Sequence, residues 1–334
     1  MNGANLAHSY WLICCEMMPD ARKLITFFGF WILASSSLAN EDLFSPFLVS
    51  PDPALSVNLC AVLLNPSLPH SDDLELHSYD YATSEGVIID DTGFIASYRV
   101  APPTLRKVIF KNRKLEIDRN VTEKEIDEVR DSANKAVARG FEKSVQPEMR
   151  DLVEKVEARL LKSQISFGVV RDQKTGKILG SLRVFKGYMS LGKLILPSLE
   201  ILREEHLLTE EDEANIKAKF KVSGSGYSEQ MGVSVSEIGQ FNIDPTLPAK
   251  QRDAVRSQLL SWLKVGHIEN TRGTLFLVHI STPYHERHYG RRYGFGQTLI
   301  EKSSIHNSNV ITEKLLLTES SALNLQLREL LGLP

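Results

Sequence analysis

Cysteine is scarce in this sequence, with only Cys14, Cys15 and Cys60 among 334 residues. Three cysteines cannot build a disulfide framework, and their spacing does not match that of a zinc site. A surplus of positive charge is also missing, because 39 Lys and Arg stand against 42 Asp and Glu. Nucleic acid is therefore not an expected partner. The sequence has no Gly-x-Ser-x-Gly elbow, P-loop, Rossmann fingerprint or His-Glu-x-x-His pair, which argues against hydrolase, NTPase, dehydrogenase and zincin functions.

The composition is that of a globular protein, with 42% hydrophobic and 24% charged residues. One segment near the N-terminus stands out. Residues 22–39 begin with Arg22 and Lys23, continue with an apolar run shorter than the roughly 20 residues that span a bilayer, and end in Ser37-Leu38-Ala39. This pattern is typical of a secretory signal, and the alternative is a buried or loosely packed N-terminal helix. If the signal is real, we expect export or membrane association through this segment; otherwise we expect a cytoplasmic protein.

We divide the chain into a signal-like or anchor segment at 1–39, an irregular N-terminal arm at 40–104 and a layered domain at 105–334. The arm is rich in proline and has few periodic apolar runs. In the domain, strands alternate with helices, which predicts an α/β or α+β fold. A hairpin over 167–185 is the clearest element. An insertion follows it at 186–232.

The order of the later elements carries a resemblance. The hairpin is followed by a strand over 233–243, a helix over 249–265, a strand over 273–281, a helix from Thr282-Pro283 to Gly294-Phe295, a strand over 310–317 and a helix over 320–331. This order resembles the GNAT acyltransferase superfamily over residues 105–318. The resemblance implies a mixed, mostly antiparallel central sheet flanked by helices. In that sheet, the strand at 237–243 should run parallel to the strand at 276–281 and separate from it at one end.

Two motifs are similar to those of the acyl-homoserine-lactone synthase and N-acyl amino acid synthase branch. Gly180-Ser-Leu-Arg183 resembles its Gly-x-x-Arg, and Glu237-Ile-Gly-Gln-Phe241 resembles its Glu-x-x-Arg-Phe. The sequence departs from the branch at Gln240, where the branch has arginine. This departure favours a simple amine or amino acid acceptor over an S-adenosylmethionine-like co-substrate. The resemblance implies an enzyme that moves an acyl group from acyl-CoA or acyl-carrier protein to that acceptor.

Amide formation from a thioester needs a base, an oxyanion donor and an acid. The resemblance implies Glu237 as the base, with a surface ion pair at a strand end as the alternative. A backbone N–H near Phe241, Asn242 and Ile243 would hold the oxyanion, and we expect the Asn242 side chain itself to point outward. Tyr289 is the candidate acid, and packing in the core is its alternative.

The phosphates of the thioester should meet the loop and the helix N-terminus after Pro245. Free N–H groups and the helix dipole attract phosphate at such a position. Alignment with the loop pattern of the family places Gln251, Arg252, Ala254 and Arg256 there. The alternative for the two arginines is a solvated basic helix face.

Arg183 and Tyr188 are the candidate substrate-binding residues. Arg183 could also be an ion-paired surface residue. Tyr188 begins an apolar stretch, ending near Leu208, that we expect to line an acyl pocket. No metal is expected, because His285 and His288 at i, i+3 have no third ligand spaced nearby.

Two other interpretations stay open. One is a GNAT-like protein without turnover that binds an acyl or amino acid ligand, and the other is an exported interaction protein of the cell envelope. Arg256 in place of a small residue favours a protein without turnover, as does Gly290 at the position where the family keeps tyrosine. Glu237 favours an enzyme.

Overall fold

The structure is a computed structural model. It describes residues 73–82, 85–89, 95–99, 104–111, 114–118, 121–141, 147–223, 230–269, 271, 273–280, 283–306 and 309–333. The segment at 1–39 lies outside the described residues, and the localisation expected from residues 22–39 stays a prediction. Within the described part, no helix is both long and apolar enough to cross a membrane.

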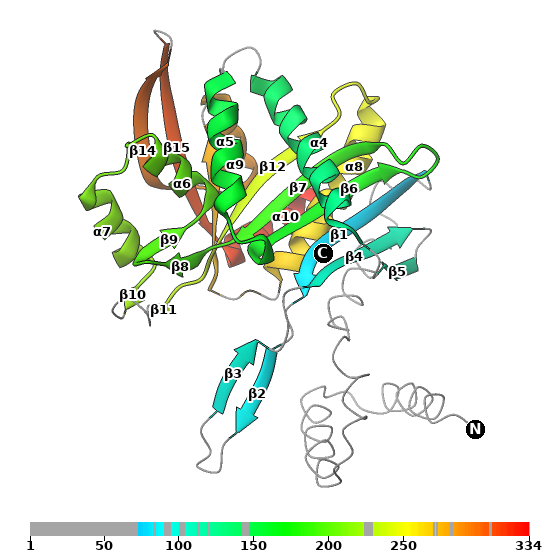
Figure 1. The fold of residues 1–334 in the computed structure, drawn as a ribbon. Helices are drawn as coiled ribbons and strands as arrows, with labels where there is room; N and C mark the ends of the chain where they lie inside the picture. Colours follow the sequence, from blue (N-terminus) through cyan, green and yellow to red (C-terminus); the bar gives the residue numbers. More distant parts are fainter. Residues whose placement is uncertain are drawn as a thin grey trace. The chain divides into compact units, whose positions relative to one another are not determined.

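Nine of the fifteen described strands build one sheet, and the other six form three two-stranded sheets (Figure 1). The nine-stranded sheet forms the core of the fold. All neighbouring strands are antiparallel except one parallel pair, β12 and β13. The mixed, mostly antiparallel sheet expected from the sequence is therefore confirmed. In their order across the sheet, the strands are β14 (Gln297–His306), β15 (Asn309–Glu319), β13 (Leu275–Ile280), β12 (Val235–Ile243), β7 (Ile178–Lys186), β6 (Ile165–Asp172), β1 (Leu74–Ala82), β4 (Thr104–Lys111) and β5 (Lys114–Asp118).

Strand β1 corrects the boundary that the sequence analysis places at residue 105. This strand lies within the sheet, between β6 and β4, although it belongs to the segment expected to be an irregular arm. Leu74 and Leu76 are buried in one core cluster and Tyr79 in the other. His77 is buried as well, and its ring nitrogens contact the Tyr79 hydroxyl at 3.1 Å and Glu75 at 2.9 Å. Because β1 buries polar side chains as well as apolar ones, its sequence lacks the regular apolar alternation by which a strand is recognised.

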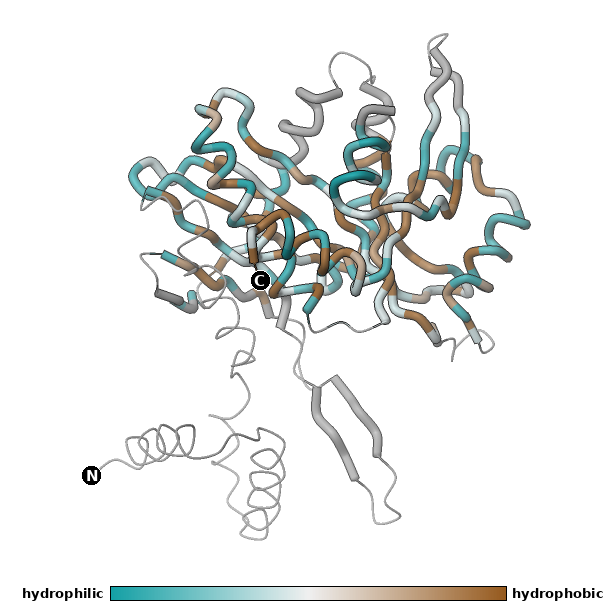
Figure 2. The backbone as a smooth tube through the Cα atoms, turned by 180° about the vertical axis from the view of Figure 1, so that it is seen from behind, coloured by the Kyte–Doolittle hydropathy of each residue, from teal (hydrophilic) through white to brown (hydrophobic). Residues whose placement is uncertain are grey.

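Helices cover both faces of the sheet (Figure 1). One face carries α4 (Glu123–Phe141), α5 (Pro147–Arg159), α6 (Pro197–Glu204) and α7 (Glu210–Lys219). The opposite face carries α8 (Ala249–Leu263), α9 (Pro283–Tyr293) and α10 (Ser320–Leu330). We call these the α5 face and the α8 face. The hydropathy view shows apolar residues gathered in the strands and on the helix sides turned toward the sheet (Figure 2).

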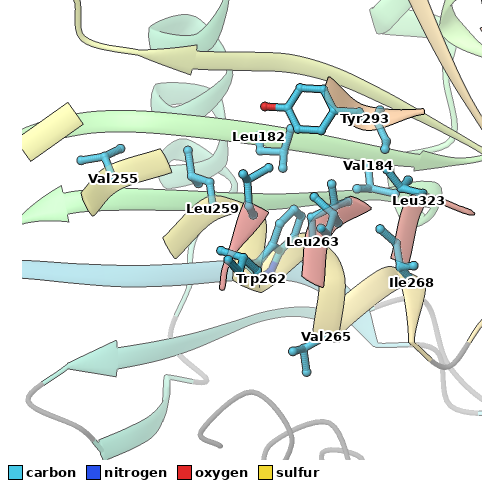
Figure 3. Packing of buried hydrophobic residues seen from close by; sticks show 14 of the residues in the cluster. Leu182, Val184, Val255, Leu259, Trp262, Leu263, Val265, Ile268, Tyr293 and Leu323 are labelled. Atoms are coloured by element: carbon cyan, nitrogen blue, oxygen red, sulfur yellow. The ribbon is translucent and has the colours of Figure 1, made fainter. Parts of the chain in front are cut away.

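Trp262 of α8 is the largest side chain in the core of the α8 face (Figure 3). It packs with Leu259 and Leu263 of its own helix, and its indole N–H donates to the Ser78 hydroxyl at 2.8 Å. The helix approaches the sheet so closely that a Cβ on Gly168 would lie 2.6 Å from the Trp262 ring. After Leu263 the helix widens into a π-helical turn over Lys264–Ile268.

The segment between β7 and β12 contains β8 (Tyr188–Ser190), β9 (Lys193–Ile195), α6, α7, β10 (Val222–Ser223) and β11 (Gln230–Met231). Its two ends meet, because Lys186 of β7 lies opposite Ser236 of β12 and the Gly187 N–H donates to the Val235 carbonyl at 2.9 Å. The segment is thus an excursion from two adjacent strands, as expected of an insertion. A separate hairpin is formed by β2 (Glu85–Ile89) and β3 (Ile95–Arg99).

Candidate active site

The two parallel strands stop pairing halfway along β12. Val235–Ile238 pairs with Leu275–Val278, and no pairing continues from there although both strands extend further. On its other edge, β12 slips in register against β7 between Gly239 and Asn242. Gln240, inside this bulge, takes the left-handed conformation with a φ of 51°. A bulge bends its strand, so β12 changes course at the place where the sequence analysis expects the two strands to separate.

Glu237 lies just before this bulge, on the α5 face. Only 3% of the residue is exposed, so it is not the surface carboxylate that was the alternative. Its Oε2 atom accepts two hydrogen bonds from Ser198, one from the backbone N–H at 3.0 Å and one from the hydroxyl at 2.7 Å. Ser198 is in the first turn of α6, where the helix dipole also favours a negative charge. The carboxylate is therefore oriented by the insertion.

Arg183 of β7 lies beside Glu237 and is buried, with 6% of the residue exposed. Its Nη2 atom is 3.7 Å from Glu237 Oε1, and its Nη1 atom donates to Glu157 Oε1 of α5 at 2.5 Å. Gln240 donates to the same Glu157 oxygen at 2.9 Å. The guanidinium lies over Gly239, where an added Cβ would be 3.1 Å from Nη2. Arg183 is therefore a buried ion-paired residue and not a surface one, and its role in substrate binding stays a prediction.

His279 lies on β13, the strand that separates from β12 beyond Glu237. It follows the last paired residue, Val278, and lies on the same face as Leu277, the partner of Glu237. Its Nε2 atom is 3.6 Å from Oε2 of the buried Glu313. Burial alone would lower the pKa of His279, but the nearby carboxylate of Glu313, with the charges of Glu237 and Glu205, raises it above its ordinary value.

The expected phosphate-binding residues are on α8, which packs on the other face of the sheet. Gln251 and Arg252 are partly exposed in its first turns. Arg256 Nη1 donates to Asp253 at 2.5 Å on the same helix. Ala254, by contrast, is buried in the core at 4% exposure, so its side chain packs against the sheet.

Helix α9 adds further positive charge close to Arg256. Arg287, His288, Arg291 and Arg292 line an open hollow on its surface. Burial is the main cause that lowers the pKa of His288, and the charges of Arg292, His285 and Arg256 lower it further.

Tyr289 lies on α9, among the rings of His288, Tyr293 and Phe295. Burial raises its pKa, which keeps the phenol protonated at neutral pH. No contact among the described residues joins it to Glu237, which is on the opposite face. Its neighbour Tyr293 carries a buried hydroxyl that has no hydrogen-bond partner in the described part of the chain (Figure 3).

The remaining expected residues are partly buried and contact the protein's own side chains or backbone. Phe241 and Ile243 contact the core of the α8 face. The Asn242 amide donates to the Gln240 carbonyl at 3.2 Å, a bond within the bulge. Tyr188 packs on Phe185 with ring centres 6.1 Å apart, and burial raises its pKa.

The stretch from Tyr188 to Leu208 was expected to line an acyl pocket. Instead, Leu194, Leu196 and Leu199 are buried in the core cluster of the α5 face. Leu191 is 92% exposed because it lies in the turn between β8 and β9. These leucines serve the protein's own packing.

Sequence analysis missed two members of the site. Glu157 is in the amphipathic helix α5 and has no motif around it. Ser198 follows the proline that opens α6, a position with an ordinary role in helix starts. The only available signal was that a serine in a helix's first turn exposes a backbone N–H and a hydroxyl to any nearby anion.

No protein-family profile matches the chain, and no curated protein matches its sequence. Solved structures are similar to it. FeeM, an N-acyl amino acid synthase from uncultured soil microbes, is 13% identical, with a TM-score of 0.37 and coverage of 62% of this chain and 92% of its own. MesI, a CoA-dependent acyl-homoserine lactone synthase, is 16% identical, with a TM-score of 0.28 and coverage of 59% and 92%. FdhC, a nucleotide-linked sugar GNAT, is 8% identical, with a TM-score of 0.30 and coverage of 60% and 88%.

Proposed function

We propose that this chain is an N-acyltransferase of the GNAT type, which moves an acyl group from a thioester to an amine. The observation that carries the proposal is the buried carboxylate of Glu237, held by Ser198 and Arg183 where β12 and β13 stop pairing. A base at this position could reach an amine on the α5 face and a thioester that comes from the α8 face.

The reaction forms a C–N bond and breaks a C–S bond. Glu237 takes a proton from the acceptor's ammonium or amine group, directly or through one water. The nitrogen of the acceptor then attacks the thioester carbonyl. Because both bonds from Ser198 go to Oε2, the Oε1 atom is the one left for the amine. A backbone N–H at Phe241, Asn242 or Ile243, beyond the last residue that pairs with β13, would stabilise the oxyanion. The leaving thiolate takes a proton from Tyr289.

The donor is acyl-CoA or an acyl-carrier protein, and both present the phosphate of a phosphopantetheine arm. The first turn of α8 offers free N–H groups, and Arg252 and Arg256 add positive charge on the same helix. The arginines of α9 extend this basic surface. The alternative, a solvated basic helix face, predicts acyl-CoA binding that does not depend on Arg256.

The test of the proposal follows free-thiol release from acyl-CoA of several chain lengths, with a panel of amines and amino acids. Glu237→Gln should reduce kcat by roughly 10²- to 10⁴-fold, the usual contribution of a general base, and should leave thioester binding nearly intact. Glu128→Gln on the exposed side of α4 is the matched control. Thiol release that is absent in the wild type with every acceptor, or equal in the wild type and Glu237→Gln, would overturn the proposal.

A further inference from the structure

Carboxylates outnumber cations on the α5 face around Glu237. The side chains of Glu157, Glu237 and Glu313 are 9%, 4% and 3% exposed. Among the described residues, the cations within 4 Å of these carboxylates are Arg183 and His279, and Lys302, the cross-strand partner of Glu313, pairs instead with Asp212. Arg183 already faces two of the three carboxylates with its two terminal nitrogens, and His279 faces the third. Buried negative charge that exceeds buried positive charge is unfavourable unless a further cation compensates it.

Glu157 shows where such a cation is missing. Its Oε1 atom accepts from both Arg183 and Gln240. Its Oε2 atom is buried and has no hydrogen-bond partner among the described residues. A buried carboxylate oxygen without a donor is unfavourable, and a donor supplied by a ligand would remove that penalty. The Arg183 guanidinium lies between the two carboxylates, with Nη1 toward Glu157 and Nη2 toward Glu237.

We infer that the acceptor of the acyl group is an amine with a second positive charge, such as a diamine, whose non-reacting ammonium binds Glu157 Oε2. This inference rests on the proposed function and names its acceptor class. The reacting nitrogen lies at Glu237, and the second ammonium lies at Glu157, with Arg183 between the two carboxylates. Each amino group of the acceptor then faces a carboxylate of the site.

The same arrangement disfavours an amino acid, which was one of the acceptors expected from the sequence. Its carboxylate would add a further negative charge beside Glu157 and Glu237. Arg183 is the natural partner for a carboxylate, but both of its Nη atoms already face carboxylates of the protein, and only its Nε is without a hydrogen-bond partner among the described residues. An acceptor carboxylate would have to compete with them in a site where like charges are poorly screened.

The test uses three acceptors of equal length that differ in charge at the far end: 1,4-diaminobutane, 1-aminobutane and 4-aminobutanoate. Thiol release from one acyl-CoA gives kcat/KM for each with the full chain. We expect the diamine to exceed the monoamine by at least about 10-fold, the range of a charge-assisted hydrogen bond, and the amino acid to be poorest. Glu157→Gln should raise KM for the diamine and bring its kcat/KM close to that of the monoamine. Glu154→Gln, on the exposed side of the same helix, should keep the wild-type ratio.

Two results would overturn the inference: 4-aminobutanoate used as well as the diamine, or a diamine-to-monoamine ratio that Glu157→Gln leaves unchanged. Calorimetric titration with 1,4-diaminobutane separates this failure from failure of the proposed function. Diamine binding that is lost in Glu157→Gln, without thiol release from any acceptor, supports the cation site and overturns acyl transfer. Thiol release with monoamines and amino acids, without diamine binding, supports acyl transfer and overturns the cation site.

Discussion

Ser198 donates two hydrogen bonds to a single oxygen of Glu237, from its backbone N–H at 3.0 Å and from its hydroxyl at 2.7 Å. Both residues are buried, at 1% and 3% exposure, so solvent does not readily replace either bond. The proposed base belongs to the sheet, but its orientation depends on a helix of the insertion.

Ser198→Ala removes the hydroxyl bond and keeps the backbone bond. Because a hydrogen bond to a buried charged group contributes about 1.5–3 kcal/mol, we expect the free energy of unfolding in urea to fall by about that amount. The kcat for thiol release should fall with it, since Glu237 loses one of the two groups that orient it. Ser190→Ala, at an exposed position of β8, is the control. Equal unfolding free energies for wild type and Ser198→Ala would show that the hydroxyl bond does not contribute.

Arg256 makes an i, i+3 ion pair with Asp253 on α8, and Arg130 makes the corresponding pair with Asp127 on α4. The two arginines are therefore matched in local setting but lie on opposite faces of the sheet. If Arg256 holds phosphate, Arg256→Ala should weaken acyl-CoA binding by about 1.5–3 kcal/mol, whereas Arg130→Ala should leave it unchanged. Calorimetry at two salt concentrations measures this effect, which should shrink at higher salt. Equal affinities for the two variants would favour a solvated helix face.

His267, in the π-helical turn after α8, gives the stability a dependence on pH. Burial, with a smaller contribution from the charge of Lys186, lowers the pKa of His267 to about 3. In the unfolded chain the imidazole takes up a proton below about pH 6.5. In the folded protein it stays neutral until about pH 3. The unfolded state therefore binds more protons in this window, and stability is lost as the pH falls through it.

One such proton changes the unfolding free energy by up to about 1.4 kcal/mol per pH unit. His267→Gln should remove this part of the slope, so that wild type and variant differ in slope between about pH 6.5 and 4.5 and run parallel above about pH 7.5. Urea unfolding across that range measures both slopes. His206→Gln, at an exposed position, should follow the wild type. Parallel curves for wild type and His267→Gln over the whole range would show that the ring is not held neutral by the fold.

The fold could be predicted where a strand or helix buries a regular apolar pattern. The hairpin of β6 and β7, the strand β13 and the helix α8 are of this kind. Strand β14 was missed because it is an edge strand, in which residues such as Lys302 and Ser303 alternate with few apolar side chains. Strand β1 was missed for a different reason, because its buried side chains include His77, whose polarity is satisfied only by tertiary contacts.

The Thr122-Glu-Lys-Glu125 spacing, which is typical of a capping box, shows the same limit. Helix α4 does begin there, but Glu125 Oε1 accepts from the Tyr79 hydroxyl at 2.8 Å and from Lys107 at 2.9 Å. The spacing of two residues can predict a hydrogen bond within the first turn of a helix. It cannot show that side chains of distant strands, here Tyr79 and Lys107, donate to the same carboxylate. In the site, likewise, Glu237 and Arg183 were found through their motifs, whereas Glu157 and Ser198 become neighbours only when α5 and α6 pack on the sheet.

The two ends of the insertion lie side by side in the sheet, which limits how far a change inside the insertion can affect the strands. Since residues 186 and 236 are fixed opposite each other in one ladder, the exposed turns of the intervening segment can change in length without shifting the strands on either side. Its buried leucines and Ser198, which hydrogen-bonds to Glu237, are less free to change. A substitution in the first turn of α6 would therefore alter the setting of the proposed base and leave the sheet unchanged.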